Sequence, residues 1–274
     1  MYFLDYAIKN IKNSSKIILV YLLLCSMNSA RSQQGLNMLD NRIMYTKYYV
    51  ADFVNKSKWL WEWDVVYRRQ SELGEPDFWK HPLRFSVRPW VGYQYSKMST
   101  LSLNPIGIFL TAPRYSTEGD LDRPSERELR TTFQIIHYSY LKRINFTHRL
   151  RFEARWRGID NPESRHYYRF RYRMRIRIPL NTNYFYKNNT LYLSTYSEKH
   201  FEAGPDYGTN FFSQSRNYIG LGYRFWEWTR IELGYLHQYN TRANNIDMDL
   251  SRGPMFYLFF DIISRTEKRY NYSF

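Results

Sequence analysis

The sequence predicts an all-β fold, a transmembrane antiparallel up-and-down β-barrel of about 10 to 12 strands. Three observations lead to this prediction. Residues alternate in polarity along many segments, which is the two-residue period of a strand. Aromatic residues make up 19% of the chain, although its mean hydropathy of -0.64 is polar. No segment after residue 32 approaches about 18 consecutive apolar residues, so we expect no transmembrane helix.

The first 32 residues have the pattern of a secretory signal peptide that is cleaved from the mature chain. Three lysines precede the apolar run 17–27, and Ala-Arg-Ser at 30–32 offers small residues to a signal peptidase. Two alternatives remain. An uncleaved membrane anchor is disfavoured because the apolar run is too short to span a bilayer. A lipoprotein with a lipid on Cys25 is disfavoured because Leu24, which precedes it, is not small.

The mature chain is expected to be strongly basic and free of cysteine. The whole chain has 40 Lys and Arg, 25 Asp and Glu and a net charge of +15. Residues 1–32 carry four basic residues and one acid, so cleavage leaves a net charge of +12. Because Cys25 is the single cysteine, we expect no disulfide, no reactive thiolate and no cysteine metal site after cleavage.

Ten segments have the alternation of a strand. They are residues 58–70, 82–96, 98–110, 126–141, 143–157, 166–180, 189–202, 213–226, 229–242 and 253–263. We therefore assign the transmembrane barrel to residues 58–263. Residues 33–57 are an N-terminal periplasmic flank or an extra strand, and residues 264–274 are a C-terminal flank or a final strand.

The connections between these segments alternate between short and long. The short ones are 96–98, 142–143, 181–188 and 227–228, and the long ones are 71–81, 111–125, 158–165, 203–212 and 243–252. The long connections contain the Gly, Pro, Asn and Asp residues typical of loops. Outer-membrane barrels have short periplasmic turns and longer extracellular loops, so we expect this protein in a bacterial outer membrane.

The strand count depends on the two flanks. We prefer ten strands, because a further strand at 42–54, joined by the short link 55–57, would invert the loop assignment. The alternating aromatic residues at the C-terminus, which end in Phe274, resemble the signal that barrel-assembly machinery recognises. That resemblance favours twelve strands and makes this machinery an expected partner.

The placement of aromatic residues distinguishes a membrane barrel from a soluble one. Alternation alone does not, because a secreted soluble barrel has the same period with its two faces exchanged. Aromatic residues cluster beside the short turns, at Trp59, Trp61, Trp63, Tyr93, Tyr95, Tyr138, Tyr140, Tyr184, Phe185, Tyr186, Phe225, Trp226 and Trp228. A belt at one level suits a bilayer interface, so we expect contact with outer-membrane lipid. The soluble barrel remains the alternative.

Arginine alternates with apolar residues on two neighbouring segments. The arginines are Arg149, Arg151, Arg155 and Arg157 on the first segment and Arg169, Arg171, Arg173, Arg175 and Arg177 on the second. The apolar faces must contact lipid, because a charge facing hydrocarbon at mid-membrane costs about 2–4 kcal/mol. We therefore expect these nine arginines in the lumen, on the face opposite to the aromatic residues of the same segments.

Such an arginine ladder needs acidic partners, because like charges opposite one another destabilise a sheet. The expected partners are Glu153, Glu198, Glu202 and Glu232. Side chains can nearly fill a barrel of this size. Two interpretations follow. Networks of Arg and Glu plug the lumen, or the lumen is narrow and prefers small anions, because rings of arginine favour them.

Several segments resemble a known family. They are WEWDVVYRRQ at 61–70, RLRFEARWRG at 149–158, YYRFRYRMRIRIPL at 167–180, YSEKHFE at 196–202, SRNYIGLGYRF at 215–225 and RIELGYLHQYN at 230–240. In this order they resemble the domain of unknown function 2490 family, whose members are regarded as outer-membrane proteins, chiefly of the Bacteroidetes. The resemblance covers most of the chain from about Trp59 to Phe260 and departs at the loop 111–125 and at the terminal flanks. It implies a barrel in the outer membrane and implies no activity.

The sequence therefore favours a narrow anion-preferring pore or a plugged structural barrel, and not an enzyme. One alternative is a lipid-modifying enzyme, for which His137 and Ser139 on one face are the best base and nucleophile. Another is a barrel that binds partners at the cell surface through its long loops. Metal and phosphate-binding motifs are missing, so we expect no cofactor. We expect no nucleic acid partner, because the arginines and the aromatic residues of the ladder segments lie on opposite faces.

Overall fold

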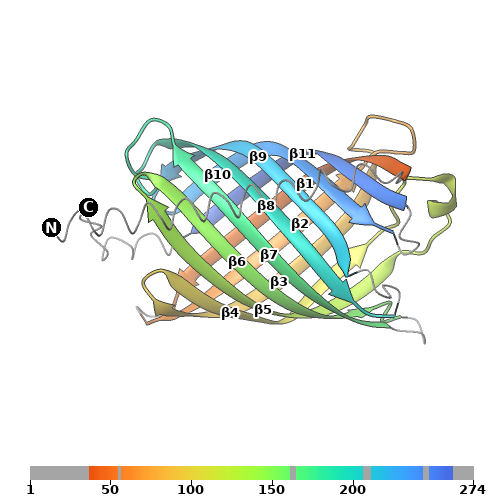
Figure 1. The fold of residues 1–274 in the computed structure, drawn as a ribbon, viewed down its shortest axis with the longest axis horizontal. Coiled ribbons are helices and arrows are strands. Elements are labelled where there is room, and N and C mark those ends of the chain that lie inside the picture. Colours follow the sequence, from red (N-terminus) through yellow and green to blue (C-terminus); the bar gives the residue numbers. More distant parts are fainter. Residues whose placement is uncertain (1–36, 55–56, 161–164, 206–210, 243–246, 262–274) are drawn as a thin grey trace.

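A computed structural model describes residues 37–54, 57–160, 165–205, 211–242 and 247–261, whose strands close into a barrel (Figure 1). The elements are β1 (Asn37–Phe53), β2 (Trp59–Gln70), β3 (His81–Ser96), β4 (Ser99–Thr111), the short helix η1 (Glu118–Asp120), β5 (Glu126–Leu141), β6 (Ile144–Arg157), β7 (Arg165–Pro179), β8 (Thr190–Ala203), β9 (Phe212–Trp226), β10 (Thr229–Thr241) and β11 (Asp247–Asp261). The predicted all-β class and the closed, mostly antiparallel barrel are confirmed. Within these residues, no helix is long and apolar enough to cross a bilayer. The expected signal peptide and the alternative final strand after residue 263 lie outside the described residues.

The strands follow one another around the barrel in chain order, and one neighbouring pair departs from the expected antiparallel arrangement. β1 and β11 close the barrel as a parallel pair, with Tyr45 opposite Met255. Every consecutive pair from β1 to β11 is antiparallel. In an up-and-down barrel with an odd number of strands, the first and last strands must run in the same direction. The eleven strands therefore require this parallel seam, whereas single-chain bacterial barrels usually have an even count.

β1 occupies the segment that we preferred to assign to a periplasmic flank. The preference for ten strands is therefore wrong, and so is the reason given for it. β1 is antiparallel to β2, and β2 leads into the long connection 71–80, so the link 54–58 lies at the short-turn end of the barrel. The short turns still lie at one end of the barrel and the long loops at the other. The difference is that the first strand begins at the long-loop end.

The parallel seam is close-packed at one point. A Cβ atom at Gly253 would overlap with the backbone carbonyl oxygen of Ile43, across the seam. Only a residue without a side chain lets β1 lie against β11 at this level. Gly253 therefore stabilises the closure of the barrel.

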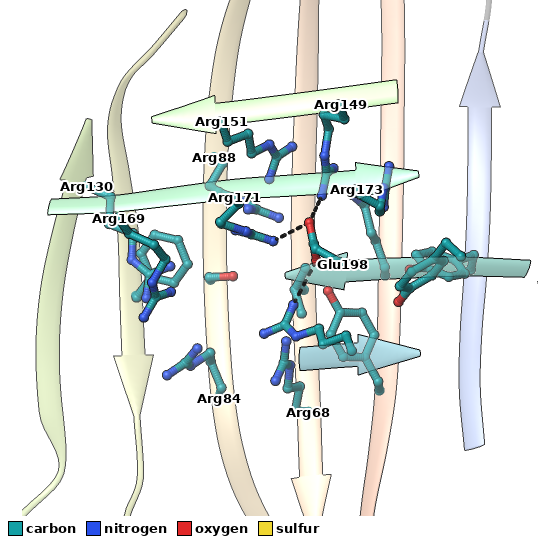
Figure 2. A pocket seen from close by; sticks show the side chains of 18 residues that line it. Arg68, Arg84, Arg88, Arg130, Arg149, Arg151, Arg169, Arg171, Arg173 and Glu198 are labelled. Carbon is teal, nitrogen blue, oxygen red and sulfur yellow. Dashed lines mark hydrogen bonds and ion pairs between the residues drawn. The ribbon is translucent and has the colours of Figure 1, made fainter. Parts of the chain in front are cut away.

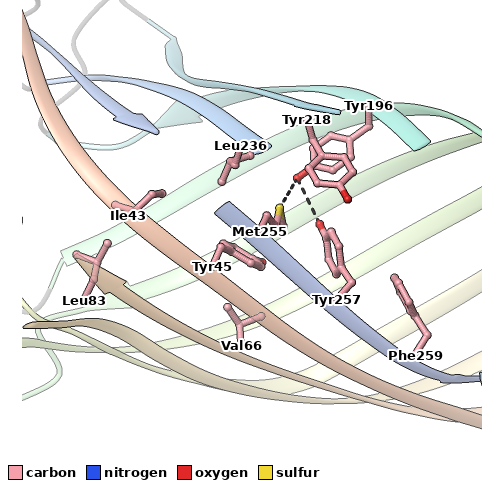
Figure 3. Close-up of a cluster of buried hydrophobic side chains, with 10 residues drawn as sticks. All are labelled: Ile43, Tyr45, Val66, Leu83, Tyr196, Tyr218, Leu236, Met255, Tyr257 and Phe259. Carbon is pink, nitrogen blue, oxygen red and sulfur yellow. Dashed lines mark hydrogen bonds between the residues drawn. The ribbon is translucent and has the colours of Figure 1, made fainter. Parts of the chain in front are cut away.

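The lumen contains both charged and apolar side chains. Arginines are most numerous on β6 and β7. Residues of β1–β3 and β8–β11 form a buried apolar and aromatic cluster (Figure 3), composed of Ile43, Tyr45, Val66, Leu83, Tyr196, Tyr218, Leu236, Met255, Tyr257 and Phe259. Within it, the hydroxyl oxygens of Tyr196 and Tyr257 are 3.3 Å apart. The interior is therefore packed with side chains and not open along its whole width.

Aromatic residues near the short turns divide between the outer wall and the lumen. Exposed on the outer wall are Trp59, Trp61, Trp63, Tyr95 and Trp226. Phe185, in contrast, is buried, and with Tyr138 and Tyr186 it lines the short-turn end of the lumen. The guanidinium groups of Arg177 and Arg224 stack on the Phe185 ring, 5.1 and 4.9 Å from its centroid. Four of the five tryptophans of the predicted belt are thus exposed on the outer wall, whereas these three aromatic residues face inward, because buried arginines need a partner there.

Candidate functional site

The structure places the nine arginines of the predicted ladder on the lumen side of β6 and β7. All of them line cavities inside the barrel. Because side chains alternate along a strand, the residues between them, such as Phe152 and Phe170, face outward. Arg149 lies directly opposite Arg173 in the hairpin, and Arg151 lies opposite Arg171. These like-charge pairs require compensation from other strands.

The four expected acids are buried and form ion pairs with the ladder. Glu153 lies 2.6 Å from Arg171, and Glu202 lies 2.9 Å from Arg169 and also pairs with Arg155. Glu232 lies 3.5 Å from Arg175 and accepts a hydrogen bond from the Tyr192 hydroxyl at 3.0 Å. Ion pairs and hydrogen bonds thus compensate these carboxylates for the loss of contact with water.

Glu198 is the acid at the centre of the lumen. Figure 2 shows it between Arg149 and Arg171, which donate hydrogen bonds to its Oε1 atom at 2.6 and 3.0 Å. Its other carboxylate oxygen lies 3.8 Å from Arg216 on β9. One carboxylate therefore contacts guanidinium groups from three strands.

Further basic residues, which no pattern in the sequence singled out, lie around the same point. They are Lys47, Arg68, Arg84, Arg88, Arg130 and Arg216, and all of them line the central cavity. Their strands carry few basic residues each, so the alternation of charge is inconspicuous. Their position in the alternation of the strand could have revealed them, because Arg84 and Arg88 are separated by even numbers of residues from the buried Ser86 and face the same way. Asp64 compensates part of this charge, because it accepts hydrogen bonds from Lys47 at 2.8 Å and Arg88 at 2.6 Å.

Aromatic rings also compensate the basic charge, which the sequence analysis did not anticipate. The Arg151 guanidinium stacks 4.8 Å from the ring centre of Trp90 on β3. Arg173, which makes no ion pair within the described residues, lies 5.3 Å from the ring centre of Tyr196. Cation–π contacts of this kind are favourable, most of all when desolvated. The ladder strands do have their own aromatic residues on the opposite face, but other strands bring aromatic rings into the lumen.

Three cavities follow one another along the lumen. The central cavity has a volume of about 30 Å³. A cavity of about 880 Å³ lies at the long-loop end, and one of about 110 Å³ lies toward the short-turn end. The central cavity shares Arg84, Arg169 and Arg216 with the cavity at the long-loop end. It shares Lys47, Arg149, Arg151, Arg173 and Tyr257 with the cavity toward the short-turn end. The narrowest part of the lumen is therefore lined by basic side chains.

The loop 112–125 reaches across the outer mouth of the barrel. Arg242, which follows β10 on the other side of the mouth, donates a hydrogen bond to Asp120 at 2.6 Å and pairs with Asp249 at 2.8 Å. Burial raises the pKa of the Asp120 carboxyl, but hydrogen bonds from Arg242 and Thr117 outweigh burial and hold this pKa below its usual value. An ionised Asp120 thus ties the loop to the opposite wall.

A Ser–His contact lies on the outer wall, but not between the expected residues. His137 Nδ1 is 2.8 Å from the hydroxyl of Ser99 on β4, whereas the Ser139 hydroxyl has no hydrogen-bond partner within the described residues. In the part of the chain that the structure describes, His137 makes no hydrogen bond to a carboxylate that would orient it. The described residues also contain no cluster of three or more His, Cys, Asp or Glu that could hold a metal ion.

The fold and the lumen define a closed β-barrel with a charged, largely arginine-lined interior. The chain belongs to the family described as "Protein of unknown function (DUF2490)", whose model matches residues 43–249. The family resemblance found in the sequence is thereby confirmed. No curated protein and no solved structure matches the chain.

Proposed function

We propose that this protein is an outer-membrane barrel whose lumen binds small anions and lets them pass. The lining of the central cavity carries the proposal, because it contains ten arginines and Lys47, with Glu198 as its acid. Rings of cationic side chains favour anions. The cavity volume of about 30 Å³ exceeds the roughly 10–15 Å³ that a cavity needs to hold one water molecule. An anion as small as chloride therefore suits this point.

Guanidinium groups around the central cavity carry hydrogen-bond donors that no protein acceptor satisfies within the described residues. Within the described residues, the Nε atoms of Arg68, Arg149, Arg171 and Arg173 are buried without a hydrogen-bond partner. A buried donor without a partner costs about 1–3 kcal/mol. These Nε atoms lie against protein atoms and not at the cavity surface, so a bound anion exchanges its hydration shell for the guanidinium groups that line the cavity.

The outer wall supports the proposed membrane location. Large apolar side chains are exposed over several strands, among them Leu103, Ile108, Ile219, Leu221 and Leu233. An exposed apolar surface of this extent marks a membrane or protein contact. The exposed tryptophans at the short-turn end are typical of a bilayer interface. We therefore infer a bacterial outer-membrane location, with lipid around the barrel and barrel-assembly machinery as the partner that inserts it.

Recordings from the refolded mature chain in a planar bilayer test the passage of anions. Under a salt gradient we expect a steady conductance whose reversal potential indicates anion selectivity. Arg173→Gln removes a lumen charge that has no acidic partner within the described residues, so selectivity should fall. Arg143→Gln removes the same charge from an exposed turn and should leave selectivity unchanged. Silence from well-folded, heat-modifiable protein would overturn the proposal and leave a plugged structural barrel.

The Ser99–His137 contact favours a lipid-modifying enzyme as the second candidate. A serine hydroxyl within hydrogen-bond reach of a histidine is the basic arrangement for acyl transfer. Covalent labelling by a fluorophosphonate tests it. Labelling of the unchanged chain that Ser99→Ala abolishes and Ser139→Ala leaves intact would support an enzyme. Equal labelling of the unchanged chain and both variants would exclude Ser99 and His137 as the reactive site.

A further inference from the structure

The outer wall of β4–β8 is hollowed near the long-loop end. One cavity of about 520 Å³ is lined by Leu103, Thr131, Phe133, Phe152, Ala154, Tyr168, Phe170, Phe201, Ala203 and Phe211, with backbone of the lumen residues between them. A second cavity of about 420 Å³ is lined by Pro105, Ile106, Leu129, Trp156 and Ile159, and both cavities include Thr131. The hollow lies outside the barrel, because Phe152 and Phe170 alternate with the lumen residues Arg151 and Arg171.

The register of the strands explains the hollow. Phe133, Phe152, Phe170 and Phe201 are direct neighbours on β5, β6, β7 and β8 and form a continuous row of rings. The next row toward the long loops consists of Thr131, Ala154, Tyr168 and Ala203, so small side chains on β5, β6 and β8 flank the exposed ring of Tyr168 on β7. Beyond it, Leu129 lies opposite Trp156. The small side chains on either side of Tyr168 lie lower than the larger ones around them and leave a recess in the wall, the trench.

Polar groups lie at the long-loop rim of this trench. Trp156 packs edge-on against His166, with ring centres 6.1 Å apart. Arg127, which shares the outward phase of Leu129, is exposed and donates from Nε to Asp160 at 2.5 Å. Within the described residues, its two Nη groups make no hydrogen bond. The trench thus combines an apolar floor with hydrogen-bond donors at the level where lipid headgroups begin.

We propose that the trench binds an acyl chain of a phosphate-bearing lipid of the outer leaflet, with the phosphate at Arg127. The proposal rests on the membrane location inferred above. A flexible acyl chain can fill a recess between aromatic rings. A second copy of this chain would present a convex wall and leave the recess empty.

Native mass spectrometry of the detergent-solubilised mature chain tests the trench, with bis-phosphorylated lipid A as the probe and dephosphorylated lipid A as its comparison. Ala154→Phe fills the floor and should weaken lipid binding roughly tenfold. Ala203→Phe fills the same row on β8 and serves if the first variant does not fold. Leu221→Phe adds a ring elsewhere on the exposed wall and is the matched control. Arg127→Gln should weaken binding of the phosphorylated lipid alone.

Equal binding by the folded trench variants and the Leu221→Phe control would overturn the proposal. The same preparations separate this result from the anion proposal. If lipid binding depends on Ala154 and the chain shows no conductance, lipid binding in the trench is supported and the passage of anions is rejected. Normal conductance of the Ala154→Phe variant with unchanged lipid binding sinks the trench and retains the pore.

Discussion

Arg171 and Arg173 occupy successive lumen positions of β7 but have different partners. Arg171 lies between two carboxylates, at 2.6 Å from Glu153 and 3.0 Å from Glu198. Arg173 lies opposite Arg149 and stacks on Tyr196 without an acidic partner in the described residues. A buried charge pair adds little stability by itself, but removal of one partner leaves an uncompensated charge. Paired residues therefore matter for folding, and unpaired residues remain for a ligand.

This distinction predicts opposite effects of two substitutions. Glu198→Gln keeps the size of the side chain but leaves Arg149 and Arg171 without a shared carboxylate, and it should lower the free energy of unfolding by about 3–5 kcal/mol. Arg173→Gln removes repulsion with Arg149 and should leave this free energy unchanged or raised. Guanidinium unfolding of the refolded barrel measures both. A larger loss from Arg173→Gln than from Glu198→Gln would contradict the assignment.

At the scale of single elements, the seam between β1 and β11 depends on Gly253. A Cβ atom at this position would overlap with the carbonyl oxygen of Ile43, so Gly253→Ala must push the two strands apart. We expect faster amide hydrogen exchange along β1 and β11, while β6 and β7 stay protected. Gly119→Ala is the matched control, because a Cβ there meets nothing within 4 Å. Unchanged amide hydrogen exchange along β1 and β11 in Gly253→Ala would show that the seam accommodates a Cβ atom and would contradict the prediction.

The loop 112–125 gives a prediction on pH. Hydrogen bonds from Arg242 and Thr117 outweigh burial and lower the pKa of Asp120 in the folded protein. A lowered pKa stabilises the contact at all pH values above the unfolded pKa of about 3.9, and this contribution is lost as pH falls through the folded value. A spin label on Gly119→Cys should therefore be immobile from about pH 7 to pH 5 and mobile in stronger acid. In the Asp120→Asn background, we expect mobility at every pH, and a transition near neutrality would refute the role of Asp120.

At the scale of the whole molecule, alternation predicted which side chains of each strand face the lumen. It could not predict which distant strands come into contact when the barrel closes. The lumen phase of Arg171 and of Glu198 followed from the two-residue period on adjacent segments. The contact of Arg151 with Trp90 could not be predicted, because β6 and β3 meet only across the closed barrel. The parallel pairing of β1 with β11 could not be predicted either. The segment 42–54 alternates visibly, but its partner β11 lies about 200 residues away, and only the odd strand count fixes its direction.

The odd strand count places the two ends of the barrel at opposite rims, and labelling in intact cells tests this. Mature chain without cysteine is expected after cleavage, so single cysteines can be introduced. If the membrane location holds, Met38→Cys at the start of β1 should react with a membrane-impermeant maleimide as Asp77→Cys does in the long connection after β2. Lys97→Cys, in a short turn, should react only after permeabilisation. A ten-stranded barrel without β1 would leave Met38 on the side of Lys97, so protection of Met38→Cys in intact cells would exclude β1 from the barrel, and with it the parallel seam.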